Sequence, residues 1–264
     1  MNKIRRRFSR GERGLSQKQG GNHYIFSAYQ NYYRQNEPVL NRVDITVTAD
    51  GEVLAQALQK GELHLAPQLG PVSMRSVLNA DGKLNDAIAG RFNLVQPPGK
   101  TFYALNYNPE SSLSRESALA IAGYADPDAY FSGIPNGVIK FGTSGETGSS
   151  AGITGADTLT TTFVSDPFLE TFMRALADTL GRDGVTLDMA DIRTPVRSTG
   201  LYTSSHIPLH PADSSDGAAN TLISFSVRQT AVSLNSIEHL TFNNFPWWMD
   251  LRSVNMPGID NLGR

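Results

Sequence analysis

A pair of histidines at helical spacing is the first feature of this chain that could hold a metal ion. His206 and His210 are four residues apart, which on a helix would place two imidazoles on one face. Pro208 lies between them, and a proline there prevents the helix that the spacing requires. The other histidines, at positions 23, 64 and 239, are isolated in the sequence. We therefore predict no metal site and no cofactor.

Two pairs of acidic residues have the side chains that general acid–base catalysis uses. Asp126 and Asp128 flank a proline in an expected turn, and Asp188 and Asp191 lie at the end of an expected strand. Catalytic carboxylates need a desolvated pocket that shifts their pKa values, and nothing in either segment indicates such a pocket. We interpret both pairs as solvated surface acids.

The glycine-rich segment 142–155 is the remaining candidate for chemistry. Ser144 follows Gly142 and precedes Gly145 in a sequence that is one residue short of a nucleophile elbow. The segment also lacks the Gly-Lys-Ser/Thr ending of a phosphate-binding loop. We predict that the protein is not an enzyme. A hydrolase is the alternative from another functional class, and it requires a nucleophile and base that the sequence does not show.

Composition places the chain among globular proteins. It has 264 residues, of which 39% are hydrophobic and 18% charged, with a formal net charge of −2. It has no cysteine, which excludes disulfides, zinc–thiolate sites and a cysteine nucleophile. The charge does not indicate a nucleic-acid partner, and no apolar run reaches the ~20 residues that span a bilayer.

Hydrophobic periodicity predicts alternating strands and helices, which is typical of an α/β fold. Residues 43–48 alternate as in a strand, and the apolar residues at positions 43, 45 and 47 are expected to point inward. A helix capped by Asp50 and ended by Gly61 follows. The clearest βαβ unit covers Thr158–Met189, where Asp166-Pro167 begins the helix. We expect strands 102–108 and 158–164 to belong to one sheet.

Changes in composition along the chain suggest its domain organisation. The first residues are rich in lysine and arginine, and no apolar stretch follows that would complete an export signal. We predict a disordered basic tail at residues 1–22, a first α/β lobe with a hinge segment at 23–141, a flexible linker at 142–157 and a second α/β segment at 158–264.

Aromatic residues crowd two segments of the chain. They are Tyr24, Phe26, Tyr29, Tyr32 and Tyr33 in one segment and Trp247 and Trp248 in the other. Large amphipathic side chains fill cores and also line ligand pockets. Packing in a core is the first interpretation of these residues, and lining of a pocket is the second.

Motifs in a fixed order run from Tyr24 to Met256. Residues 24–43 read YIFSAYQNYYRQNEPVLNRV, residues 61–63 read GEL, and residues 102–108 read FYALNYN, followed by a helix that begins after Ser114. The segments TLTTTFVSDPFLETFMRALADTLGRDGVTLDMADI and SIEHLTFNNFPWWMDLRSVNM come later. Together these motifs resemble the family 5 extracellular solute-binding proteins of ABC importers for peptides and nickel. The chain departs at His64, where the family has aspartate, and it is much shorter than a full member.

The resemblance implies an α/β, periplasmic-binding-protein-like (type II) fold that is incomplete relative to the full family. In this fold two lobes close around a ligand. It also implies that the protein binds a small solute, first of all a peptide, as the substrate-binding component of an ABC importer. The partners implied are a small-molecule or peptide ligand and ABC permease subunits, with no nucleic acid bound through this segment and no membrane span.

The resemblance also implies which residues bind the ligand. Tyr103, Asn106 and Asn108 are expected to face the cleft, and Tyr33 and Trp247 are expected to contribute aromatic walls. A cytoplasmic ligand-sensing domain of a transcriptional regulator, as in sugar-stress regulators with this fold, is the alternative function. The family favours a periplasmic location and the lack of a signal peptide a cytoplasmic one, so the sequence leaves the location open.

Overall fold

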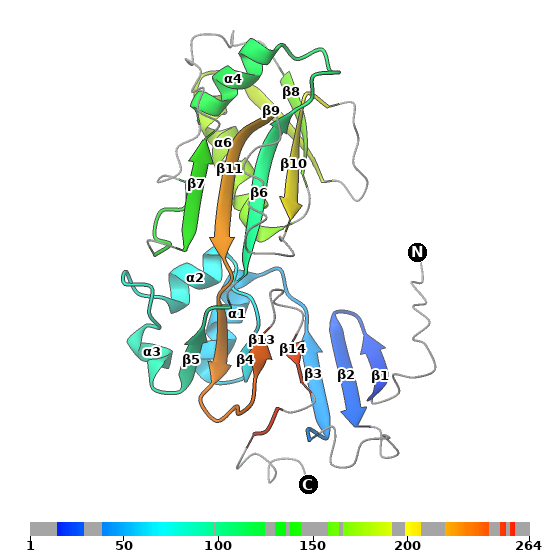
Figure 1. The fold of residues 1–264 in the computed structure, drawn as a ribbon, viewed down its shortest axis with the longest axis vertical. Helices are drawn as coiled ribbons and strands as arrows, with labels where there is room; N and C mark the ends of the chain where they lie inside the picture. Colours follow the sequence, from blue (N-terminus) through cyan, green and yellow to red (C-terminus); the bar gives the residue numbers. More distant parts are fainter. Residues whose placement is uncertain are drawn as a thin grey trace.

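Strand β6 (Lys100–Tyr107) lies in the sheet of an upper lobe, and the chain enters it from a lower lobe through β5 (Phe92–Val95) (Figure 1). The computed structural model describes residues 15–28, 39–97, 99–124, 130–135, 138–143, 158–163, 166–191, 199–206, 220–242, 249–251 and 254–256.

Six strands form the mixed sheet of the upper lobe, in the order β7-β11-β6-β10-β8-β9. The strands added here are β7 (Ile139–Thr143), β8 (Thr158–Phe163), β9 (Thr186–Asp191), β10 (Leu201–His206) and β11 (Thr221–Arg228). β6 pairs antiparallel with β10 and with β11, whereas β8 pairs parallel with β9 and with β10. Because β6 and β8 both belong to it, the prediction that these two strands share a sheet is confirmed.

Helix α6 (Pro167–Arg182) connects β8 to β9 and completes the predicted βαβ unit. Asp166 caps its first turn, because one carboxylate oxygen accepts the backbone N–H groups of Phe168 and Leu169 at 2.8 and 3.3 Å. Pro167 occupies the first helical position, where no N–H is needed. Local sequence signals therefore determine where this helix begins.

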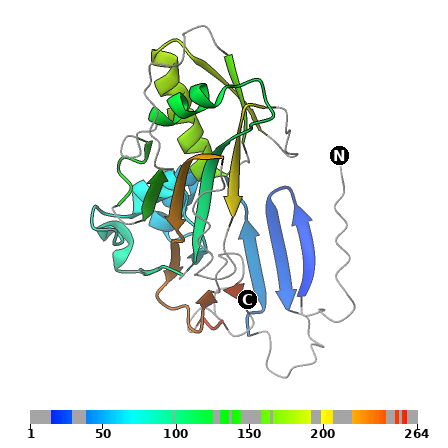
Figure 2. The same cartoon turned by 45° about the horizontal axis from the view of Figure 1, so that its top comes forward.

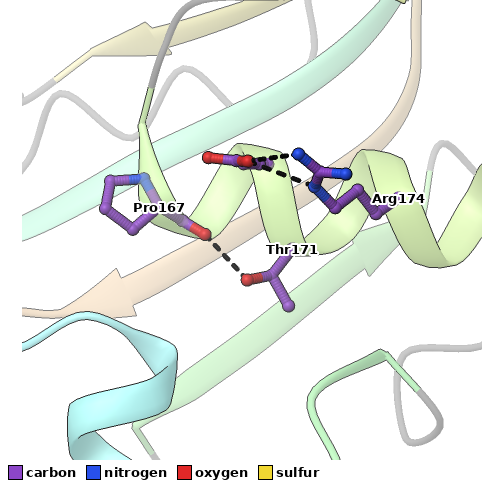
Figure 3. Close-up of polar contacts among 4 residues, drawn as sticks. Pro167, Thr171 and Arg174 are labelled. Atoms are coloured by element: carbon purple, nitrogen blue, oxygen red, sulfur yellow. Dashed lines mark hydrogen bonds and ion pairs between the residues drawn. The ribbon is translucent and has the colours of Figure 1, made fainter. Parts of the chain in front are cut away.

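One face of α6 packs on the upper sheet and the other faces solvent. The buried residues of the helix are Phe168, Leu169, Phe172, Met173, Leu176 and Leu180. On the outer side, the Arg174 guanidinium pairs with the Glu170 carboxylate at 2.7 Å, and the Thr171 hydroxyl donates to the Pro167 carbonyl at 2.8 Å (Figure 3). The apolar stripe predicted from the sequence is therefore the face that anchors the helix.

The lower lobe has a three-stranded sheet in the order β4-β12-β5. Its elements besides β5 are α1 (Gly51–Lys60), β4 (Leu65–Ala66), α2 (Pro71–Val77), α3 (Asp86–Ala89) and β12 (Ala231–Leu234). Further described elements are helix α4 (Arg115–Gly123) and the paired strands β13 (Thr241–Phe242) and β14 (Met249–Asp250). Helix α2 was not predicted from the sequence.

Each lobe combines parts of the chain that are distant in sequence. β12 follows β11 directly, so the chain leaves the upper lobe and pairs in the lower lobe with β4 and β5 (Figure 2). β6 and β7 lie in one sheet with β8–β11, so the division into lobes at residues 23–141 and 158–264 differs from this arrangement. The predicted linker falls mostly outside the described residues. Pairing between distant strands carries no local sequence signal, which explains the difference.

A separate three-stranded sheet contains β1 (Leu15–Gly20), β2 (His23–Ala28) and β3 (Arg42–Thr46). β1 lies within the predicted disordered tail, where its main chain pairs with β2. Ile45 and Val47 are 39% and 57% exposed, so the prediction that both point inward is wrong. Alternation identifies a strand, but burial of its apolar face also requires a second layer.

The ends of α1 agree with the sequence prediction. The Asp50 side chain accepts from the backbone N–H groups of Glu52 and Val53, and Gly61 ends the helix with φ at 75°, in the left-handed region. A β-carbon on Gly61 would lie 2.7 Å from Nη1 of Arg91, whose guanidinium donates to the Gln59 carbonyl. Gly61 is therefore required by the backbone conformation, whereas the Arg91 guanidinium is the end of a flexible side chain that can shift to make room.

We predict that Gly61→Ala lowers the free energy of unfolding by about 1–2 kcal/mol, because an L-residue is strained in this conformation. Urea denaturation monitored by circular dichroism measures the change. Gly90→Ala is the matched control, because Gly90 has φ of −73° and nothing within 4 Å of the added carbon. Equal stabilities for the two variants would contradict the prediction.

Candidate ligand-binding site

The two faces of β6 have different surroundings, because successive side chains of a strand point to opposite sides. Thr101, Tyr103 and Leu105 are buried on the face that α6 covers. Phe102 and Asn106 point to the other face. Strand periodicity alone therefore separates Tyr103 from Asn106, although both were expected to face one cleft.

Tyr103 lies in the core of the upper lobe, with 1% of its surface exposed. Its ring stacks on Phe225 with 4.9 Å between centroids, and it packs against Phe168 of α6 at 6.0 Å. Its hydroxyl donates to the Asp166 carboxylate at 3.1 Å. In this structure the residue therefore joins β6 to the start of α6 and does not line an open surface, in contrast to the expectation.

Burial controls the ionisation of this tyrosine–aspartate pair. Desolvation raises the pKa of Tyr103, and the neighbouring Asp166 charge raises it further. Desolvation also raises the pKa of Asp166, although the N–H groups of Phe168 and Leu169 and the Tyr103 hydroxyl act in the opposite direction. The carboxylate is therefore held by hydrogen bonds in surroundings that disfavour its charge.

Asn106 lies on the opposite face, at the centre of a hydrogen-bonded network between strands. Its side-chain oxygen accepts from the Thr221 hydroxyl of β11, and its amide nitrogen donates to the Ser204 hydroxyl of β10, both at 2.9 Å. Asn106 is 4% exposed. These bonds use one donor and one acceptor of the amide and fix the strands on each side of β6 in register.

Asn108 follows the end of β6 and is half-buried. Its amide nitrogen donates to the Thr199 carbonyl at 3.2 Å, and its side-chain oxygen accepts the Glu110 N–H at 3.1 Å. The structure thus brings Asn106 and Asn108 to one end of the sheet, both with structural hydrogen bonds. The other expected ligand-binding residues, Tyr33 and Trp247, lie outside the described residues.

A cationic and aromatic surface occupies the opposite end of this polar face, next to the lower lobe. We call it the hinge-end surface, and its residues are Lys100, Phe102, Lys140, His206, Ser226 and Arg228. Strand register places Lys140, Ser226, Phe102 and His206 in one row across four strands, with Arg228 and Lys100 paired beside that row. His206 stacks on Phe102 with 5.3 Å between ring centroids.

The sequence reasoning missed this surface, although part of its signal was present. Lys100 and Phe102 alternate with buried residues on β6, and on β11 the exposed Arg228 follows the buried Val227. Their meeting depends on the pairing of β6 with β11, of β11 with β7 and of β6 with β10. Short-range patterns do not encode those pairings.

Two connections join the lobes, at residues 96–99 and 229–230. Gln229 is 3% exposed, and neither polar atom of its side chain has a hydrogen-bond partner among the residues that the structure describes. The Thr230 carbonyl accepts the Leu69 N–H of the lower lobe at 2.9 Å. A buried side-chain amide without partners costs free energy, because its polar atoms have lost their hydrogen bonds to water.

The lobes also touch on the side that carries α6. Arg75 of α2 donates to the Ser132 carbonyl at 2.8 Å, and Gly70 lies close to Pro167 at the start of α6. Tyr130, two residues before Ser132, packs its ring edge-on against Phe172 of α6, so the segment that contains Ser132 belongs to the upper lobe. The α6 side of the junction is therefore closed by direct contacts between the lobes, and the hinge-end surface lies on the other side of the sheet.

The described residues contain neither a cluster of metal ligands nor a helix that could span a membrane. No three His, Asp or Glu side chains of that part of the chain come together as around a metal ion. Within the same residues, none of the helices has both the length and the apolar character needed to cross a bilayer.

Solved structures with this fold include solute-binding proteins. The chain is similar to a dipeptide-binding protein from Pseudoalteromonas sp. SM9913 in complex with Met-Leu, with a TM-score of 0.63, 9% identity, and 88% of this chain and 62% of that chain covered. It is similar to the oligopeptide-binding protein AppA from Bacillus subtilis in complex with a nonapeptide (TM-score 0.60, 10% identity, 88% and 64% covered). It is also similar to NikA from Staphylococcus aureus in complex with Ni(L-His)2 (TM-score 0.60, 11% identity, 88% and 66% covered).

These similarities establish the fold. The expected α/β, periplasmic-binding-protein-like architecture and the resemblance to family 5 solute-binding proteins are confirmed at that level. The chain spans less than two thirds of the length of each of these three proteins, in agreement with an incomplete form of the fold. No protein-family model matches the sequence, and no curated protein matches it.

The raised pKa of Asp166 leads to a prediction about stability. The carboxyl of the unfolded chain titrates near 3.8, so between this pH and the higher folded pKa the folded protein holds more protons. The stability advantage of the wild type over Asp166→Asn should therefore decrease as pH rises through this window, by about 1.4 kcal/mol for each unit of pKa shift. Urea denaturation of both proteins at a series of pH values measures this.

Tyr103→Phe provides a second arm of the same experiment. It removes a hydroxyl that stabilises the ionised carboxylate, so the decrease with pH should become steeper than in the wild type. If the difference in the free energy of unfolding between the wild type and Asp166→Asn stays constant or increases with pH, burial does not disfavour the ionised form of the Asp166 carboxyl.

Proposed function

We propose that this chain binds a small solute, first of all a peptide, between its two lobes and without catalysis. The observation that carries the proposal is the architecture: two sheets joined by the connections β5–β6 and β11–β12. Such a pair of connections can act as a hinge between lobes. The fold is also that of proteins solved with Met-Leu, with a nonapeptide and with a nickel–histidine complex.

The role that we propose for the bound state is that of the substrate-binding component of an ABC importer. Closure of the lobes would bury the ligand and create the surface that permease subunits recognise. A ligand that contacts both lobes stabilises the closed arrangement by its differential affinity for the two states. Main-chain groups at strand ends would bind an extended peptide with little dependence on its side chains.

Native mass spectrometry of gently purified protein tests this proposal, because a solute held between closed lobes should co-purify as a discrete mass. Adding a small peptide at about 100 times its dissociation constant should stabilise the fold by about 2.7 kcal/mol. Thermal unfolding with a peptide mixture, with amino acids and with nickel–histidine measures this stabilisation. A protein that carries no ligand and melts at one temperature in all of these mixtures would contradict the proposal.

A further inference from the structure

The first turn of α6 is a point at which the upper lobe meets the lower lobe. β6 leads away from the junction and β10 runs antiparallel to it, so β8, which is parallel to β10, runs back toward the lower lobe. α6 follows β8 and begins at this end with Pro167. A β-carbon on Gly70, the N-cap of α2, would lie 3.3 Å from the β-carbon of Pro167. The two helix starts are therefore in direct contact.

The lower-lobe segment at this contact is packed on both sides of Gly70. Leu69 is fully buried, and its N–H donates to the Thr230 carbonyl at 2.9 Å. Pro71, the first residue of α2, is also buried. Because close-packed residues do not move independently, separation of this segment from α6 requires the lower lobe to move as a unit.

Asp166 lies at this contact, directly before Pro167, and is half-buried. One carboxylate oxygen accepts the N–H groups of Phe168 and Leu169, and the other accepts the Tyr103 hydroxyl. Among the described residues, the donors to this carboxylate thus belong to β6 and α6, and none belongs to the lower lobe. The lower lobe therefore adds cover to the carboxylate without a hydrogen bond that would compensate for the loss of water.

The charged groups around Asp166 leave burial as the main influence on it. Tyr103 faces it from β6, and on α6 the Glu170 carboxylate is paired with Arg174. Arg75, the charged residue of α2, donates to a backbone carbonyl of the upper lobe. Desolvation is the largest influence on the Asp166 carboxyl and raises its pKa. The surroundings in this arrangement of the lobes therefore disfavour the ionised form.

Rotation about the two connections between the lobes changes this contact. The connections at residues 96–99 and 229–230 lie between the α6 side and the polar face of the sheet, and their sequences contain no charged residue. Rotation about them widens one side as it narrows the other. When the α6 side widens, water reaches the Asp166 carboxylate and its pKa falls toward the ordinary value of 3.8. Proton binding is therefore linked to the arrangement of the lobes.

We propose that the protonation of Asp166 controls the contact between α2 and α6: the neutral carboxyl favours contact of the lobes on the α6 side, and the carboxylate favours their separation there. Contact predominates at low pH and is lost as pH rises through the range above 3.8 in which the buried carboxyl ionises. A difference of one pKa unit between the two arrangements changes their ratio about tenfold. This inference goes beyond solute binding, because it concerns the ligand-free protein.

Pulsed electron resonance on the ligand-free protein tests the proposal. Spin labels are placed at Gln56→Cys on α1 and Asp178→Cys on α6, two exposed positions on the lower and upper lobes. Between about pH 4 and about pH 7 the ratio of separated to contacting lobes should rise by about threefold or more. Asp166→Asn keeps an N-cap side chain without a charge, so it should hold the shorter distance at every pH.

Asp188→Asn is the matched control, because it removes an exposed carboxylate from β9 and should follow the wild type. Tyr103→Phe removes a donor to the Asp166 carboxylate, so the change in distance should move to higher pH. A wild-type distance that is independent of pH, or an Asp166→Asn variant that changes with pH as the wild type does, would overturn the proposal. Circular dichroism at each pH shows whether the fold is intact, and solute binding does not enter the test.

Discussion

A single antiparallel pair of chain segments runs through both lobes, and the rest of the structure depends on it. In the upper lobe β6 pairs with β11 as far as Lys100 and Arg228, and in the lower lobe β5 pairs with β12 from Val95 and Ala231. The connection at residues 96–99 is two residues longer than the one at 229–230, so the ladder cannot continue in one register. Each lobe is therefore held rigid by main-chain pairing that is interrupted between them, which is the property that a hinge requires.

Contacts around this interruption are distributed unevenly. On the α6 side, Arg75 ties the lower lobe to the carbonyl of Ser132, and Gly70 approaches Pro167 closely enough to exclude a larger side chain without adjustment. At the hinge itself, the buried side-chain amide of Gln229 has no hydrogen-bond partner within the described part of the chain. The lobes are in contact on the α6 side, and the polar face of the upper sheet lies on the opposite side. This arrangement is suited to a hinge motion that separates the lobes on the side of the polar face.

The sequence predicted elements whose signals are local. The cap by Asp166, the proline after it and the apolar stripe predicted α6 with its ends, and Asp50 with Gly61 did the same for α1. The order of the motifs predicted the fold class, because it reflects a whole series of such elements. The inward orientation of Ile45 was wrong, because burial depends on a second layer that alternation does not report.

The site was harder to predict because it depends on strand pairing. Side-chain alternation would have separated Tyr103 from Asn106, but only the pairing of β6 with β10 and β11 shows that Asn106 meets Ser204 and Thr221. The same holds for the hinge-end surface, whose members come from four strands that are distant in sequence. Residue type and spacing along one segment cannot report this arrangement.

The central claim is that two rigid lobes move about the connections between β5 and β6 and between β11 and β12 when a solute binds. The chain has no cysteine, so spin labels can be placed at single introduced cysteines without background. Labels at the exposed positions of Lys60 in the lower lobe and Asp188 in the upper lobe report the distance between lobes by pulsed electron resonance. The account predicts a broad distance distribution without ligand that narrows and shifts when a binding peptide saturates the protein. An unchanged distribution with a peptide that demonstrably binds would contradict it.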